Sequence, residues 1–165
     1  MKKGWLSDQA WQAVQQKLPI CCVDVLLTKR ARSGISAVGL IHRHTPHQGC
    51  RWCLIGGRLL LNESLKAAIA RQVRETLGAQ AQCVLDSTAQ PLLLMEYFSV
   101  RRERSLFDPR QHAIAVVFSA RVRGPIKAQG EALDFRWFDL QRLPSAASFG
   151  FGQQKVVAEC IRRLT

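Results

Sequence analysis

The chain has 165 residues, 47% of them hydrophobic, which is enough for one domain with a sizeable core. It carries 24 Lys and Arg against 12 Asp and Glu, and the net charge of +12 favours anionic partners such as nucleotides or nucleic acid. No apolar run is long enough to span a bilayer. The N-terminal lysines are followed by polar residues rather than an apolar segment, so we expect no signal peptide and a cytoplasmic protein.

Helices and strands are mixed along the chain. A first helix, capped by Ser7 or Asp8, ends where Pro19 cannot continue it. Apolar runs predict strands over residues 20–28, 35–42, 51–55, 81–85, 92–100, 112–123 and 134–139. A second helix follows the third strand, and an amphipathic helix over 153–164 ends the chain. This succession predicts a single α+β domain with a mixed sheet over residues 1–165.

One segment, HTPHQGCRWC, holds four potential zinc ligands at intervals of three: His44, His47, Cys50 and Cys53. Structural zinc sites usually join two separated ligand pairs rather than four ligands in one short run. Pro46 and Gly49 are typical of a loop. We therefore prefer a loop that leads into a core strand, with zinc as the alternative.

The second helix lies within GGRLLLNESLKAAIARQVRETLGA, residues 56–79. Asn62 is a suitable N-cap, and Gly78 is a suitable left-handed residue at the end of the helix. An apolar residue recurs every four positions and predicts one buried stripe: Leu65, Ile69, Val73 and Leu77.

The same helix carries three charges. Arg71 and Glu75 are four residues apart and share a face. Glu63 reaches Arg71 only if the preceding chain folds back, which the glycine pair at 56–57 would allow. From the spacing alone, a solvated face with weak ion pairs is the preferred interpretation.

This stretch resembles the signature of the Nudix hydrolases, which runs Gly, five residues, Glu, seven residues, Arg-Glu, an aliphatic, one residue, Glu-Glu, one residue, Gly and an aliphatic. Here it reads Gly57, RLLLN, Glu63, SLKAAIA, Arg71-Gln72, Val73, Arg74, Glu75-Thr76, Leu77, Gly78 and Ala79. The first glycine, the first Glu, the Arg, the first of the paired glutamates and the closing glycine match. The resemblance implies an α/β/α sandwich.

A closer resemblance, to the GDP-mannose mannosyl hydrolase branch, extends from about Leu6 to Trp137. It includes the strand that holds Asp24, TPHQGCRW before the double glycine, and FRW at 135–137. It implies a hydrolase of a nucleoside diphosphate linked to another group, such as the nucleotide sugar GDP-mannose. Many relatives are dimers, so a homodimer is also implied.

The resemblance further implies a divalent cation, Mg²⁺ or Mn²⁺, which prefers oxygen ligands and bridges to substrate phosphates. Glu75 would be a ligand, with the carbonyl of Gly56 or Gly57 as a second and Gln72 beside them. Glu63 and Arg71 would form a structural ion pair that shapes the site.

Other residues would contact the substrate. Arg58 and Arg43 match arginines near the substrate phosphates, and Asp24 matches the substrate side of the site. Together with Glu75 and Arg71, Glu131 is a candidate for catalysis, as a ligand or as the base.

Three departures weaken the match. Gln72 and Thr76 stand where the family has carboxylates, and Ala132 stands near the place of the branch's histidine base. Three hypotheses follow. The protein is a divalent-metal hydrolase, a Nudix fold that binds a nucleotide or other anion without turnover, or a nucleic-acid or protein-interaction module supported only by the charge.

Overall fold

The computed structural model describes residues 6–32, 34–85, 90–103 and 105–165. Its helices and strands in chain order are α1 (Asp8–Lys17), β1 (Ile20–Ala31), β2 (Gly34–Thr45), β3 (Gly49–Cys53), β4 (Ile55–Arg58), α2 (Leu65–Leu77), β5 (Gln82–Val84), β6 (Leu93–Phe98), β7 (Leu106–Phe107), β8 (Ala113–Arg123), β9 (Asp134–Asp139) and α3 (Gln154–Leu164). None of the described helices is long and apolar enough to cross a membrane.

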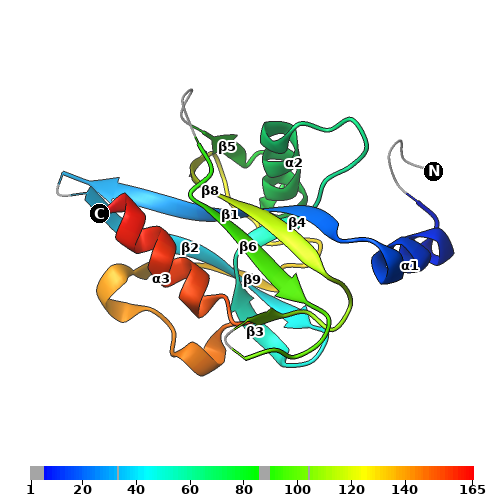
Figure 1. Ribbon diagram of the computed structural model, residues 1–165. Coiled ribbons are helices and arrows are strands. Elements are labelled where there is room, and N and C mark those ends of the chain that lie inside the picture. The colour runs from blue at the N-terminus through cyan, green and yellow to red at the C-terminus, as the bar shows by residue number, and fades with distance from the viewer. Residues whose placement is uncertain (1–5, 33, 86–89, 104) are drawn as a thin grey trace.

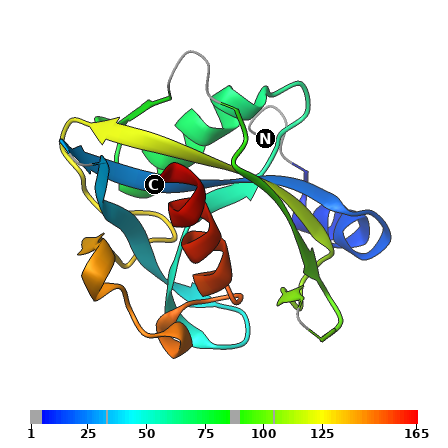
Figure 2. The ribbon, with the colours of Figure 1, turned by 60° about the vertical axis from the view of Figure 1, so that its left-hand side comes forward.

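The sheet is mixed and curled, with α2 against one face and α3 against the other (Figure 1). Figure 2 shows the same two helices on opposite sides of the strands, with α1 at the edge of the molecule. The helical side chains that face the sheet are buried: Ile69, Val73 and Leu77 of α2, and Val156, Val157 and Cys160 of α3. This arrangement confirms the predicted α+β fold with its sandwich of helices around a mixed sheet.

Two central strands organise the sheet. β1 and β8 pair in parallel from Ile20 opposite Ala113 to Leu27 opposite Ala120. The other edge of β1 is shared by two partners, β4 over 22–25 and β2 over 27–31. Because both faces of β1 are covered, nearly every residue from Cys22 to Thr28 is buried, as in strands inside a parallel sheet.

The histidine-rich segment is a tight hairpin, so the loop prediction was wrong in its extent. β2 continues to Thr45 and β3 begins at Gly49. The Thr45 hydroxyl closes the turn by accepting from the Gln48 N–H at 3.1 Å and donating to the Gly49 carbonyl at 2.9 Å. Gly49 adopts a φ of +68°, which glycine reaches without strain.

The predicted strand over 51–55 is instead divided between β3 and β4. The break falls at Leu54, whose backbone N–H donates to the side chain of Gln153 at 2.8 Å and not to a strand. The double glycine that follows is therefore part of β4, and it pairs directly with Asp24 and Val23 of β1.

The ends of α2 also differ from the prediction. Ser64, not Asn62, is the N-cap, and its hydroxyl accepts from the Ala67 N–H at 3.2 Å. Asn62 lies in the preceding turn with a φ of +63°. Gly78 has a φ of +101° but an extended ψ of 155°, so it ends the helix without entering the left-handed helical region.

Between the predicted strands over 92–100 and 112–123, the structure has the additional short strand β7, which pairs in parallel with β6. Arg104 of this connection lies outside the described residues, as does Ser33 between the first two predicted strands.

Candidate active site

A cleft of about 530 Å³ opens between α1, the β1–β4 pair and the C-terminal part of α2. Its lining includes most of the residues singled out from the sequence: Asp24, Arg43, Gly56, Gly57, Arg58, Gln72, Glu75 and Glu131. Glu63 and Arg71 are not among the lining residues and lie behind this wall. The volume is within the range of small-molecule sites, about 300–1,000 Å³.

Arg71 and Glu63 form a partly buried, two-point ion pair. The Arg71 Nε lies 2.7 Å from Glu63 Oε1, and Nη2 lies 2.8 Å from Oε2. Each carboxylate or guanidinium also binds backbone: Glu63 accepts from the Leu60 N–H at 3.0 Å, and Arg71 donates to the Arg58 carbonyl at 3.0 Å. The two side chains are only 13% and 12% exposed. Charge-assisted hydrogen bonds therefore hold the segment between β4 and α2 in place. Glu63 and Arg71 do not form the solvated face that the spacing alone predicted.

The hydrogen bond from Arg71 lowers the pKa of Glu63, which therefore stays ionised in this setting. Arg71 also reaches Glu75 at 3.1 Å, one turn further along α2, so one guanidinium joins both glutamates.

The double glycine is needed because two side chains press against it. A Cβ at Gly56 would lie 2.0 Å from Asp24 Oδ1 and 2.5 Å from the Val23 carbonyl oxygen. A Cβ at Gly57 would lie 2.3 Å from the end of the Gln72 side-chain amide. Any residue larger than glycine would displace the contents of the site.

Gln72 binds the carbonyl that was predicted to hold the metal. In the amide orientation that gives both ends a partner, its nitrogen donates to the Gly56 carbonyl at 3.3 Å. Its oxygen then accepts from Arg71 Nη1 at 3.0 Å. The amide therefore joins the glycine strand to the Arg71 network.

The residues present do not fit a divalent cation of the family type. The carbonyl of Gly56 faces a donor, Thr76 is 2% exposed, and Glu75 is paired with Arg71. Among the described residues, no group of three or more His, Cys, Asp or Glu is arranged to hold a metal ion. Metal-ligand roles for Glu75, Gly56, Gly57 and Gln72 stay predictions.

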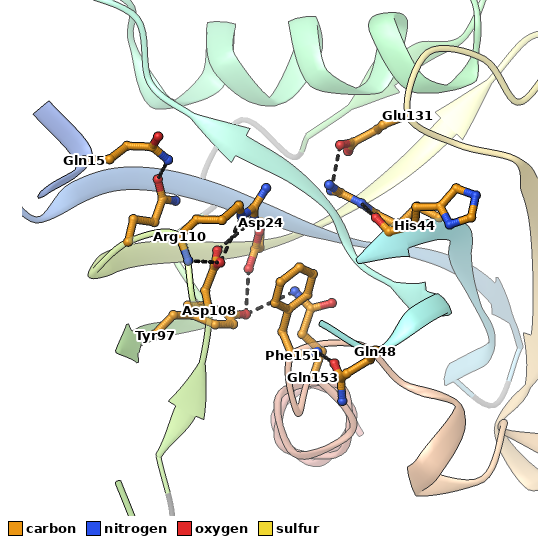
Figure 3. Close-up of polar contacts among 12 residues, drawn as sticks. Gln15, Asp24, His44, Gln48, Tyr97, Asp108, Arg110, Glu131, Phe151 and Gln153 are labelled. Atoms are coloured by element: carbon orange, nitrogen blue, oxygen red, sulfur yellow. Dashed lines mark hydrogen bonds and ion pairs between the residues drawn. The ribbon is translucent and has the colours of Figure 1, made fainter. Parts of the chain in front are cut away.

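Glu131 is held opposite α2 by the loop that precedes β9. The Gln129 N–H donates to the Thr76 carbonyl at 2.9 Å, and Gly130, with a φ of +60°, passes close to the Glu75 carbonyl. The Glu131 carboxylate meets Arg43 Nη1 at 2.6 Å (Figure 3). Burial raises the pKa of Glu131, and the Glu75 charge adds to the rise, while Arg43 and Arg110 oppose it.

Asp24 lies at the buried end of the cleft, only 8% exposed. The Tyr97 hydroxyl donates to Asp24 Oδ2 at 3.1 Å, and Gln153 Nε2 donates to the Tyr97 oxygen at 3.1 Å (Figure 3). Burial raises the Asp24 pKa to about 6, against the lowering effects of Tyr97 and Arg43. This carboxyl can therefore exchange a proton near neutral pH.

Several lining residues were not foreseen. The Arg58 guanidinium stacks over the Trp11 ring at 3.7 Å. Arg110 binds Asp108 through two bonds of 2.7 and 2.9 Å. Trp11 lies in the predicted first helix, where only its helical spacing was informative. Asp108 and Arg110 lie in a charged segment between two predicted strands, and no motif marks them.

The four histidine and cysteine residues of the hairpin do not converge. His44 Nδ1 lies 3.2 Å from Cys50 Sγ, but His47 packs edge-on to Phe107 at 4.9 Å. Cys53 is buried, and its Sγ lies in the core near Gly150. A zinc site built from all four is not present in this arrangement.

Three solved structures share this architecture. A structure described as a possible asymmetric diadenosine tetraphosphate hydrolase from Jonesia denitrificans has a TM-score of 0.82 and 25% identity, over 90% of this chain and 96% of that one. A MutT Nudix hydrolase from Burkholderia pseudomallei has a TM-score of 0.66 and 18% identity, over 90% of this chain and 100% of that one. The Nudix domain of NrtR from Shewanella oneidensis, in complex with ADP-ribose, has a TM-score of 0.64 and 20% identity, over 97% and 100%.

Together, the fold and these neighbours define the chain as a Nudix-fold protein. Within that class, the chain belongs to the family described as a domain of unknown function (DUF4916), whose model matches residues 1–162. No curated protein matches the sequence.

Proposed function

We propose that the protein hydrolyses a nucleoside diphosphate linked to a second group, such as the nucleotide sugar GDP-mannose. The observation that carries this proposal is the single cleft in which Arg43, Arg58 and Glu131 line one space with the double glycine. Structures of similar fold are described as a diadenosine tetraphosphate hydrolase and as an ADP-ribose complex. Both of those ligands are nucleoside phosphates.

The arginines of the cleft are suited to the phosphates. A guanidinium binds phosphate oxygens through two parallel bonds, more strongly than a neutral donor does. The Arg58 guanidinium carbon lies 3.7 Å from the centre of the Trp11 ring, so a phosphate at Arg58 would bring the base or sugar next to an aromatic side chain. Trp11 and Arg58 would then bind adjacent parts of the same ligand.

Glu131 is the proposed general base. In the free protein its carboxylate is held by Arg43 at 2.6 Å. A phosphate that binds Arg43 would compete for the same guanidinium and release the carboxylate to accept a proton from water. The water oxygen would then form the new bond to the phosphorus or the sugar carbon, and the group displaced from that atom would keep the electron pair of the broken bond. Desolvation raises the pKa of Glu131 above its usual value, although its side chain is still 35% exposed, and a raised pKa makes the carboxylate a stronger base.

The direct test is a panel of nucleotide sugars, ADP-ribose, dinucleoside polyphosphates and nucleoside triphosphates, each with Mg²⁺, Mn²⁺ or EDTA, followed by ³¹P NMR. We expect turnover of at least one diphosphate-linked compound, and a loss of about 100-fold or more in kcat for Glu131→Gln. Glu159→Gln, an exposed carboxylate on α3, is the control and should keep full activity. No turnover anywhere in the panel would refute hydrolysis.

The attacked atom can be assigned in the same assay. Hydrolysis in ¹⁸O-labelled water places the label on phosphate if phosphorus is attacked, and on the sugar if carbon is attacked. Label on the sugar would support the specific resemblance to mannosyl hydrolases.

A second candidate is binding without turnover, which the contact between Gln72 and the Gly56 carbonyl favours. It predicts saturable nucleotide binding by calorimetry and no product in the panel. We also propose that the protein acts in the cytoplasm as a homodimer. Cell fractionation and analytical ultracentrifugation test these two points.

A further inference from the structure

We propose that this cleft recognises its diphosphate without a divalent cation, because groups of the chain already occupy the positions that a cation would need. The inference rests on the ligand class proposed above. It concerns how the negative charge of that ligand is balanced, and it assigns Gln72 the role of filling the metal position.

The first observation is the contact made by the Gln72 amide. Its nitrogen points at the Gly56 carbonyl, while its oxygen accepts from Arg71. A metal ion at this position would compete with the amide N–H for the same carbonyl oxygen. The contact is also confined sterically, because Gly57 leaves room for the amide and a Cβ there would overlap it.

The second observation is that the nearby carboxylates are already paired with protein groups. Glu75 is bound to Arg71, Glu131 to Arg43, and Asp108 to Arg110. A cation at this side of the cleft would compete with these contacts, and it would find no group of three acidic, imidazole or thiol ligands in the described part of the chain.

The third observation concerns charge. The side of the cleft formed by α2 has Gln72 and Thr76. With glutamate at both positions, it would carry two more negative charges. In that setting a metal has to offset repulsion between the wall and the phosphates. Here the acids are fewer, and three arginines, Arg43, Arg58 and Arg110, line the cleft. A phosphate can therefore exchange with a carboxylate on a guanidinium, with no ion between them.

The claim that the cleft holds no divalent cation is tested without any nucleotide. Mn²⁺ binding is measured by electron paramagnetic resonance on the wild-type protein, on Gln72→Glu and on the control Gln154→Glu, which adds the same charge to exposed α3. We expect Mn²⁺ binding to strengthen about tenfold or more in Gln72→Glu only, because a second carboxylate then faces Glu75. Saturable Mn²⁺ binding by the wild type that Glu75→Gln abolishes would overturn the proposal. Thermal melts identify any variant that fails to fold.

The ligand half is tested by calorimetry with ADP-ribose and GDP-mannose, in EDTA and in excess Mg²⁺. We expect the wild-type Kd to change by less than about twofold between the two buffers, and Arg43→Gln to weaken binding about tenfold in both. Binding that requires Mg²⁺ would overturn the proposal. Failure to bind in either buffer would refute the ligand class of the proposed function instead, and the Mn²⁺ titration would still show whether the cleft holds a metal.

Discussion

Helices α2 and α3 carry similar groups of charges in different surroundings. On α2, Arg71 meets Glu63 at 2.7 Å, and on α3, Arg162 meets Glu159 at 2.7 Å. The Arg71 side chain is 12% exposed, whereas the Arg162 side chain is 69% exposed. The α2 pair also binds the backbone of the segment that leads into the helix, through Leu60 and Arg58.

The comparison shows that the length of an ion pair does not measure its contribution. An exposed ion pair replaces water contacts with a contact between the two charges, which gains little free energy, and salt screens it further. A buried pair that also satisfies backbone groups fixes the path of the chain, and its removal leaves charges and donors without partners. The predictions below test how far burial, and not distance, decides the outcome.

The largest effect is expected for Arg71→Ala. It leaves the largely shielded Glu63 carboxylate without its cation and removes the Arg71 donor to the Arg58 carbonyl. Urea denaturation should show a loss on the order of 4 kcal/mol in the free energy of unfolding. The matched change on α3, Arg162→Ala, should leave the urea midpoint within experimental error. Equal losses of unfolding free energy in the two variants would contradict the claim that burial decides the contribution of an ion pair.

Asp24→Asn tests a buried carboxyl whose hydrogen-bond donor is a tyrosine rather than an arginine. Folding raises the Asp24 pKa from 3.8 to about 6. Between these values the unfolded chain is ionised while the folded chain binds the proton, so the wild type loses stability as the pH rises through this window. The variant has no such group. At pH 7.5 it should be more stable than the wild type by at most about 3 kcal/mol.

The pH profile supplies the control for this change. The difference in unfolding free energy between Asp24→Asn and the wild type should vanish below about pH 3, where the carboxyl is protonated in both states. A difference that stays constant from pH 4 to pH 8 would show that Asp24 is not desolvated in the folded protein.

Adjacent glycines provide the next contrast. Gly56→Ala places a methyl group against Asp24 and the fixed Val23 carbonyl and should cost about 2 kcal/mol or more. Gly57→Ala meets only the end of the Gln72 side chain, which can move, so its cost should be smaller. Thermal unfolding of both variants measures the difference. A larger loss for Gly57→Ala would mean that Gln72 is held more rigidly than its contacts indicate.

The smallest effect is expected from salt on the α3 cluster. Glu159 is bound by Arg162 and Arg163 at the surface, which lowers its pKa to about 2. Glu159→Gln should give the same unfolding curve as the wild type in high salt, because these exposed charges are screened. A large loss of stability in Glu159→Gln at high salt would contradict this view of the surface pairs.

The sequence was sufficient for the elements with strong local patterns. The buried stripe of α2 and the long apolar strand β8 lie where the spacing predicted them. Errors occurred where a distant group decides a boundary. Leu54 leaves the strand because it binds Gln153, which is 99 residues away in the chain.

The site was predictable only where a motif extends along one segment. Arg71, Glu75 and the double glycine belong to one stretch of sequence, so the family pattern located them. Tyr97 reaches Asp24, and Gln153 reaches Tyr97, only after β6 has paired with β8 and α3 has packed on the sheet. Nothing in their immediate neighbours marks them as part of a site.

The central claim is that the cleft between α1 and α2 is where a nucleotide-type ligand binds. Trp11 lines this cleft, whereas Trp52 and Trp137 do not. A titration of ¹⁵N-labelled protein with GDP-mannose or ADP-ribose in EDTA therefore reads the site through the indole N–H signals, assigned by single Trp→Phe variants. We predict a saturable shift of the Trp11 signal with Trp52 and Trp137 unmoved. An unchanged Trp11 chemical shift, or a shift confined to Trp52 or Trp137, would contradict this account.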